Sequence, residues 1–424
     1  MRVGDIRARA ANGGRISLAL ALSYVFDWVI IIAAVAVGGV LSLISPNMRP
    51  FALNNTQISF PFQEHEMVPA WLMFVIGCVG PAFIIFLIAI ILVPGPTVPK
   101  STPKSLIWRR KLWEWHTGWL GLALALASAF LITQGMKNLF GKPRPDLLSR
   151  CKPNLAEKEK FVLGGFAEID PAFLVYSAAI CTQTDKSILD DGFRSFPSGH
   201  SSFSSSGLIY LSLFIASKLA ITLPFLPASA YTSDEHAAFP SRMPKSSSRV
   251  NMSTTSLEEA GTNQKIVAAR NMAAAPPIYL LIFAIIPFFA SIYVSATRFS
   301  DFRHHGFDIL FGYTIGAITA IFAFRYYHLP ISQGAGWSWG PRSKDRSFWA
   351  GVGVGNYVGN RGGPITLTST GTGSLPRTGS QGMTESQGMT EVDLERSNSF
   401  DRPASNDVGI GEPRQHTGIK ESSR

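Results

Sequence analysis

The segment LALALSYVFDWVIIIAAVAVGGVLSLI, residues 18–44, decides the fold class, because Asp27 is its only charged side chain. An apolar run of about 20 residues has the length of an α-helix that crosses the hydrocarbon core of a bilayer. Further runs of this kind lie at about 69–93, 115–136, 200–223, 277–296 and 307–328. The sequence therefore predicts an all-α, polytopic membrane protein with six transmembrane helices.

The run at 200–223 is the least apolar of the six because serines crowd its start. Such small residues suit close packing between membrane helices. A soluble protein with buried helices is the alternative interpretation, but six long apolar runs with polar connectors are hard to reconcile with it. The net charge of +10 shows no basic stripe on one face, so we expect no nucleic-acid partner.

The distribution of lysine and arginine predicts the orientation, since cytosolic connectors carry an excess of both. Five lysines and arginines and no acid lie in 100–111, between the second and third runs. In connector one, residues 45–68, Arg49 is the only lysine or arginine. We therefore expect both termini to lie in the cytosol. The opposite side, luminal or extracellular, is expected to hold connector one, the connector at about 137–199 and the turn before 307. The particular membrane is not predicted.

The expected organisation is a cytosolic tail at 1–15, a six-span domain at 16–330 and a cytosolic tail at 331–424. Within the domain, 224–276 is rich in Ser, Pro and Ala and predicts a flexible cytosolic loop. The C-terminal tail is Gly, Ser and Thr rich, with an SQGMTE repeat, and is expected to be largely disordered.

Two cysteines, Cys151 and Cys181, lie on the predicted non-cytosolic side. Oxidising conditions there favour a disulfide between them, with two free thiols as the alternative. Asn54 begins an Asn-Asn-Thr glycosylation sequon on the same side.

The cluster TRFSDFRHHGFD, residues 297–308, combines a carboxylate with two histidines. His304 lies four residues before Asp308, and a carboxylate that binds one imidazole nitrogen leaves the other free to attack. His305 is three residues before the same aspartate, so helical spacing does not exclude it. Arg298 can hold a phosphate oxygen in a bidentate way.

The cluster PSGH, residues 197–200, precedes an apolar run, so it predicts a helix N-terminus whose amides bind an anion. The Ser198 hydroxyl and the Gly199 backbone would add donors, and a protonated His200 could donate to a leaving oxygen. The cluster KNLFGKPRP, residues 137–145, supplies Lys137 and Arg144, which can neutralise phosphate oxygens. Its prolines predict that the preceding helix ends near Gly141.

Each cluster also has a simpler interpretation. Lys137 and Lys142 could be interfacial anchors, the PSGH turn could be a helix cap, and the two adjacent histidines could bind a metal. The predicted topology, however, brings all three clusters to one side of the membrane, and together they hold what a histidine-based cleavage of a phosphate ester needs.

Taken together, the three clusters resemble the signature of the type 2 phosphatidic acid phosphatase superfamily. The resemblance lies in the spacings Lys137-x6-Arg144-Pro145, Pro197-Ser198-Gly199-His200 and Arg298-x5-His304-x3-Asp308. The flanks RPDLLSRC (144–151), FRSFPSGHSS (193–202), TRFSDFRHH (297–305) and ISFPFQEHEMVP (58–69) are similar to fungal diacylglycerol pyrophosphate phosphatases. The resemblance covers about 15–330 and implies a catalytic core of the helical-bundle kind shared with haloperoxidases.

The resemblance also implies roles for the residues. His304 would be the nucleophile that forms a phosphohistidine, supported by Asp308, and His200 would protonate the leaving group. The phosphate would be held by Lys137, Arg144, Ser198, Gly199 and Arg298. No metal or other cofactor is implied. Thr297 stands where the family often has serine, and a hydroxyl is kept.

The expected activity is hydrolysis of diacylglycerol pyrophosphate to phosphatidate, and of phosphatidate and lysophosphatidate to the dephosphorylated lipid. A sphingoid-base phosphate or a polyisoprenyl pyrophosphate is an alternative substrate, because the clusters recognise phosphate and not the attached group. A non-catalytic, lipid-binding membrane protein is the alternative from another class. Acyl preference and oligomeric state are not predicted.

Overall fold

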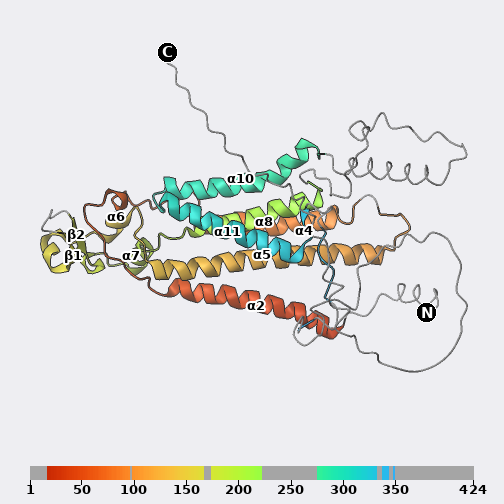
Figure 1. Cartoon of the computed structure of the whole chain (residues 1–424), viewed down its shortest axis with the longest axis horizontal. Helices are drawn as coiled ribbons and strands as arrows, with labels where there is room; N and C mark the ends of the chain where they lie inside the picture. The colour runs from red at the N-terminus through yellow and green to blue at the C-terminus, as the bar shows by residue number, and fades with distance from the viewer. Residues whose placement is uncertain are drawn as a thin grey trace, which may run out of the picture. The chain divides into compact units, whose positions relative to one another are not determined.

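The computed structural model describes residues 17–95, 98–166, 173–221, 275–331, 337–342 and 347–348. Its described part is a bundle of long helices with a small cap at one end (Figure 1). The predicted tail at 1–15, nearly all of the loop at 224–276 and most of the tail at 331–424 lie outside the described residues.

Apolar runs form the bundle where the sequence places them. The helices are α2 (Leu18–Leu43), α3 (Ala70–Phe74), η2 (Val75–Val79), α4 (Gly80–Ile91), α5 (Lys104–Phe140), α8 (Gly199–Lys218), α10 (Ile278–Ser300) and α11 (Gly306–Tyr327). The second run is a continuous helical stretch from Ala70 to Ile91 whose middle, η2, is a π-helical turn. The third run is longer than predicted, because α5 continues in both directions beyond 115–136. It ends next to Gly141, as the prolines predict, and Gly141 adopts the left-handed conformation that closes the helix.

Five helical segments of the described part are long and apolar enough to cross a membrane, and α8 is not among them. The predicted segment 200–223 does form a helix, but its sequence is too polar to count as a span by composition. The reason is its position, since α8 packs against α4, α5, α10 and α11 in the middle of the bundle. A helix covered by its neighbours needs no apolar surface toward lipid.

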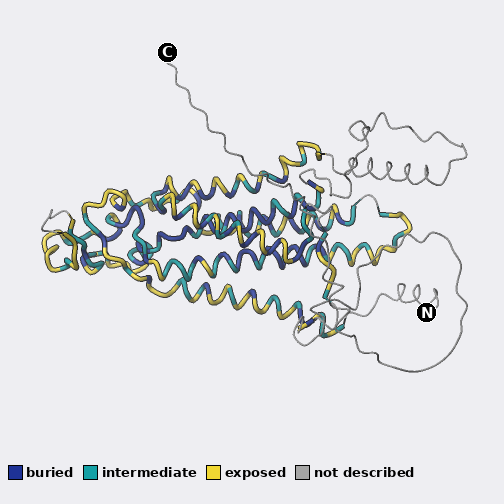
Figure 2. Tube along the Cα trace, in the orientation of Figure 1, coloured by how far each residue is buried: buried dark blue, intermediate teal, exposed yellow. Residues whose placement is uncertain are grey.

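Burial follows the same arrangement (Figure 2). The main apolar cluster joins α4, α5, α8, α10 and α11, and includes Leu126, Tyr210, Phe214 and Phe324. Large apolar side chains of α2 and α10, such as Phe26 and Phe283, remain exposed. An exposed apolar surface on the outer helices is what a lipid environment requires.

The cap follows α5 and leads into α8. It contains α6 (Leu147–Cys151), η3 (Leu155–Phe161), β1 (Val162–Gly165), β2 (Leu174–Tyr176), η5 (Ala178–Ile180) and α7 (Lys186–Gly192). The two strands pair antiparallel, with Val162 opposite Tyr176. Connector one, with η1 (Thr56–Ile58), packs on the cap through Phe51 and Ile58.

A disulfide joins Cys151 to Cys181 inside the cap. It ties the end of α6 to the segment before α7, next to the apolar cluster of the cap. Asn54 lies exposed in connector one, at the same end of the molecule.

Candidate active site

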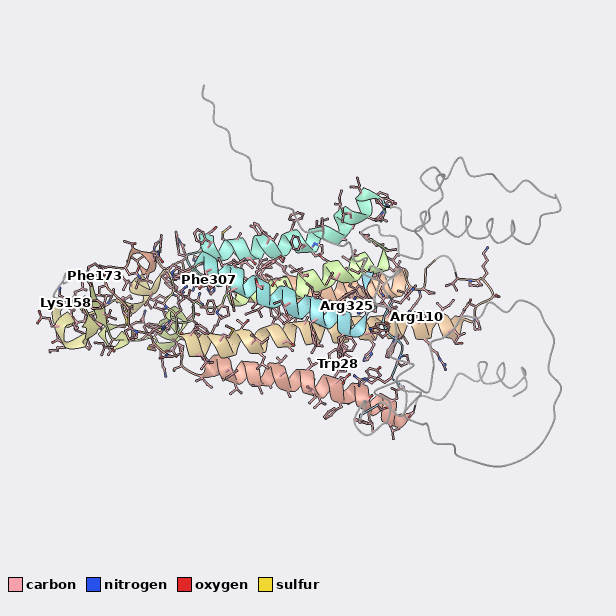
Figure 3. All side chains as sticks on the ribbon, in the orientation of Figure 1. Trp28, Arg110, Lys158, Phe173, Phe307 and Arg325 are labelled. Atoms are coloured by element: carbon pink, nitrogen blue, oxygen red, sulfur yellow. A yellow bond between two sulfur atoms is a disulfide. The ribbon has the colours of Figure 1, made fainter. Side chains whose placement is uncertain are left out.

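The three sequence clusters meet where the bundle joins the cap. Lys137 lies in the last turn of α5, Ser198 caps the start of α8, and His304 lies in the turn between α10 and α11. In Figure 3, Phe307 marks this end of the bundle, and Arg110 and Arg325 mark the opposite end. Antiparallel packing of α5, α8, α10 and α11 thus brings together residues that the sequence separates widely.

The ammonium group of Lys137 lies beside the N-terminus of α8. A Cβ added to Gly199 would lie 3.0 Å from Lys137 Nζ, so glycine permits this approach. Within the described residues, Nζ makes neither a hydrogen bond nor an ion pair, whereas the other cations of the site all do. A cation without a counterion beside helix N–H groups is suited to binding an anion.

Ser198 is buried and caps α8, since its Oγ accepts from the Ser201 amide at 3.4 Å and from the Ser201 hydroxyl at 3.0 Å. Its own hydroxyl proton is not used in either bond. Both the cap and the donor interpretation of the PSGH turn are therefore compatible with this geometry.

The imidazole of His304 is buried, and its orientation is set by the backbone. Nδ1 lies 2.6 Å from the carbonyl oxygen of Ser195, so Nδ1 carries the proton and donates it. Nε2 is then left with its lone pair. Burial lowers the pKa of His304 well below its usual range, and the nearby Arg144 and Lys137 lower it further. The ring is therefore neutral at neutral pH, the state that a nucleophile needs.

Within the described residues, Asp308 makes no hydrogen bond or ion pair with His304, contrary to the expected carboxylate–histidine pair. Its Oδ2 lies 3.1 Å from His305 Nδ1 and accepts from the Ser195 hydroxyl at 2.6 Å, and its Oδ1 pairs with Lys142 at 2.8 Å. The physical reason is that α11 begins at Gly306, so His304 precedes the helix and the spacing of four residues does not apply. Instead His305 and Asp308 form a reciprocal cap of α11.

Asp308 is linked to His304 indirectly, through Ser195. The same Ser195 that gives its hydroxyl to Asp308 gives its carbonyl to His304. Asp308 is thus a positioning residue in this geometry, acting through the backbone of residue 195.

His200 follows the start of α8 and faces connector one. Its Nε2 lies 3.1 Å from the Val68 carbonyl oxygen and 3.8 Å from a carboxylate oxygen of Glu66. Since a carbonyl oxygen only accepts, Nε2 of His200 carries a proton in this geometry.

The arginines of the site are buried and paired with acids. Arg144 binds both the carboxylate and the carbonyl of Asp191 at 2.7 Å. Arg298 binds Glu66 and Asp301, each at 2.6 Å. Burial alone would raise the pKa of Asp191, but the surrounding cations, Arg144 first, outweigh it and lower that pKa to about 2.

Sequence reasoning missed several residues of the site, namely Glu66, Lys142 as a partner of Asp308, Asp191, Ser195 and Arg303. Four of them lie within the segments that carry the resemblance, and Asp191 lies just before one, but no helical spacing links them to a histidine. Glu66 had one signal, its place in ISFPFQEHEMVP, and nothing in that stretch predicts which cation it meets.

An apolar cavity of about 350 Å³ adjoins the site. His304 lines it together with Phe60, Phe299, Phe302 and Pro145. The rings of Phe60 and Phe302 stack with centroids 4.9 Å apart, so connector one and the turn before α11 form its walls together. An apolar space next to a histidine and a set of cations suits a ligand with one charged and one apolar part.

Several proteins named as phosphatases are similar to the chain in sequence. A Dictyostelium discoideum PA-phosphatase related-family protein is 33% identical over 199 residues, 47% of this chain and 53% of that protein, so the match spans about half of the relative. Diacylglycerol pyrophosphate phosphatase 1 of Saccharomyces cerevisiae is 26% identical over 68% of this chain and 74% of its own. Lipid phosphate phosphatase 1 of Arabidopsis thaliana is 25% identical over 85% of this chain and 80% of its own.

No solved structure matches the chain. The sequence model of the PAP2 superfamily matches residues 118–331, which is just over half of the sequence. This part carries all three clusters. The resemblance read from the clusters is thereby confirmed, and the chain belongs to the PAP2 superfamily.

Proposed function

We propose that the chain is an integral membrane lipid phosphate phosphatase that uses His304 as its nucleophile. The observation that carries the proposal is the neutral, buried imidazole of His304, whose Nδ1 is held by the Ser195 carbonyl. The same site contains the ammonium of Lys137, which has no acidic partner in the described part of the chain. A fixed nucleophile beside anion-binding groups is what transfer of a phosphoryl group requires.

The proposed reaction has two steps. His304 Nε2 attacks phosphorus, the P–N bond forms, and the P–O bond to the lipid breaks as His200 gives a proton to the leaving oxygen. Water then attacks the phosphohistidine, His200 takes up a proton from it, and the P–N bond breaks to release inorganic phosphate. Lys137, Arg144, Arg298, the Ser198 hydroxyl and the Gly199 amide stabilise the charge on the phosphoryl oxygens.

The apolar cavity beside His304 supports a lipid as the group attached to phosphate. The names of the yeast and plant relatives favour diacylglycerol pyrophosphate and other lipid phosphates. We therefore propose that diacylglycerol pyrophosphate is cleaved to phosphatidate and phosphatidate to diacylglycerol, within phospholipid metabolism.

We also propose a six-span arrangement with the site at the luminal or extracellular face. Basic residues at 100–111 and Arg325 lie at the end of the bundle opposite the site, which supports this orientation (Figure 3). α8, the fourth span in sequence order, would complete the six and be shielded from lipid by the helices around it.

Replacement of His304 by alanine tests the proposal. We expect at least about a thousandfold slower phosphate release from diacylglycerol pyrophosphate and from phosphatidate in detergent micelles that contain EDTA. The control is His65→Ala, which removes an exposed histidine of connector one and should leave the rate unchanged.

Residual activity near the wild-type rate in His304→Ala, or a requirement for Mg²⁺, would refute the histidine mechanism. A wild-type protein that binds these lipids without releasing phosphate would instead point to a non-catalytic lipid-binding protein. Phosphate release from a sphingoid-base phosphate or a polyisoprenyl pyrophosphate alone would change the proposed substrate and leave the proposed mechanism unchanged.

A further inference from the structure

A carboxylate of connector one fills the space between two arginines of the candidate site. One oxygen of Glu66 lies 2.6 Å from a terminal nitrogen of Arg298, and the other lies 2.9 Å from a terminal nitrogen of Arg303. Glu66 thus bridges the two guanidinium groups, which is the way a carboxylate or a phosphate is held by such forks.

The two arginines form a buried anion position. The side chain of Arg298 is 1% exposed and that of Arg303 is 8% exposed, whereas Glu66 retains 23%. Within the described residues, the Nε of Arg303 is buried without a hydrogen-bond partner. Arg303 therefore has donor capacity that Glu66 leaves unused.

The neighbours of Glu66 hold connector one along the site. The Gln63 carbonyl accepts from Arg303 at 2.9 Å, the Met67 amide donates to Asp301 at 3.1 Å, and the Val68 carbonyl lies 3.1 Å from His200. Glu66 is consequently placed beside the same histidine and arginine to which the proposed mechanism gives roles.

A phosphate and the Glu66 carboxylate cannot share this position. Two anions this close repel each other, and both would need the same donor of Arg298. A substrate that takes this donor of Arg298 must therefore move Glu66 aside. The move also removes the Glu66 contact of Arg303, which keeps the Gln63 carbonyl and Asp191 as partners.

We propose that Glu66 is an internal anion that occupies the Arg298–Arg303 part of the phosphate site and is displaced by a phosphate oxygen of the substrate. Glu66 then determines the affinity for tetrahedral oxyanions, and Arg303 is an additional phosphate-binding residue. This inference rests on the proposed function, because it requires that Arg298 binds phosphate.

The test measures binding of orthovanadate to the full-length protein in detergent, by calorimetry. Glu66→Gln keeps the shape of the side chain but removes the competing charge, so we expect about tenfold tighter binding, the effect of one charge-assisted hydrogen bond. Glu64→Gln makes the same charge change two residues away, on an exposed side chain, and should leave the dissociation constant within about twofold of wild type. Equal or weaker binding by Glu66→Gln would overturn the proposal.

A second measurement needs no variant. Displacement of Glu66 should loosen residues 62–68, so orthovanadate should speed amide hydrogen exchange of that segment in the wild-type protein. Unchanged or slower exchange on binding would contradict displacement.

The two proposals fail in different ways. If the wild-type protein does not bind orthovanadate, the phosphate site itself is wrong and both proposals fall. If it binds orthovanadate, and His304→Ala abolishes turnover, but Glu66→Gln binds no tighter, only the role of Glu66 is refuted.

Discussion

His304 owes its orientation to a backbone carbonyl and not to a side-chain carboxylate. The Ser195 carbonyl fixes the proton on Nδ1, and Asp308 reaches the same residue through the Ser195 hydroxyl. A carbonyl is neutral, so it orients the ring without favouring its protonated form as strongly as a carboxylate would. This fits a histidine that must stay uncharged until it attacks.

The lowered pKa of His304 predicts acid sensitivity of the fold. The unfolded chain takes up the proton below about pH 6.5, whereas the folded protein resists it, so the free energy of unfolding should fall by up to about 1.4 kcal/mol per pH unit below that point. His304→Asn, which cannot titrate, should lose less stability between pH 7 and pH 5. Thermal unfolding in detergent across this range measures the difference.

The matched control for this experiment is His65→Asn, which should follow the wild-type pH dependence because His65 is exposed. Parallel curves for the wild-type protein and His304→Asn would show that the ring at 304 is not kept neutral by folding.

At the scale of elements, α8 is the helix on which the site depends. Its serines and the glycines of α11 let the two backbones approach closely, and this contact sets the distance between the PSGH turn and the turn that carries His304. A Cβ on Gly316 of α11 would lie 1.9 Å from Ser205 Oγ and 2.2 Å from the Ser202 carbonyl oxygen, both in α8.

Gly316→Ala should therefore push α11 away from α8. We expect a loss of about 1–3 kcal/mol of stability, from overpacking, and a matching loss of phosphatase activity as the clusters separate. Thermal unfolding and phosphate release on the purified variant measure both effects.

Gly39→Ala is the matched control, because nothing lies within 4 Å of a Cβ at that position of α2. It should be neutral or slightly stabilising, by about 0.5–1 kcal/mol, since alanine favours a helix. Equal effects of the two variants would refute the close crossing of α8 and α11.

At the scale of the whole molecule, charge and apolar surface predict how the bundle sits in a membrane. The outer helices expose apolar side chains, the basic residues at 100–111 lie at one end, and the cap with its disulfide lies at the other. A disulfide at one end and basic residues at the other support the proposed orientation, with the cap in an oxidising compartment.

This orientation can be read from cysteine labelling in sealed microsomes. Lys100→Cys, at the basic end, should react with a membrane-impermeant maleimide directly, whereas Lys158→Cys, in the cap, should react only after the membrane is permeabilised. Both lysines are exposed, so accessibility within the protein is matched. The reverse pattern would place the candidate site in the cytosol.

Much of the fold was predictable because it depends on local sequence. The apolar runs give the helices, and Gly141 with its flanking prolines gives the end of α5. The count of six spans was less secure at α8, since hydropathy reports contact with lipid and α8 contacts other helices. Composition cannot distinguish a polar, shielded span from a helix outside the membrane.

The site was predictable in its reacting groups but not in its contacts. The sequence by itself determined that Lys137, His200 and His304 lie at one end of the bundle, because helical spans of fixed length alternate in direction. Only the tertiary structure decided that Asp308 contacts His305 and Ser195, and that Glu66 meets Arg298 from 232 residues away. Helical periodicity relates residues within one helix, whereas these contacts join turns and connectors whose approach is set by packing of the whole bundle.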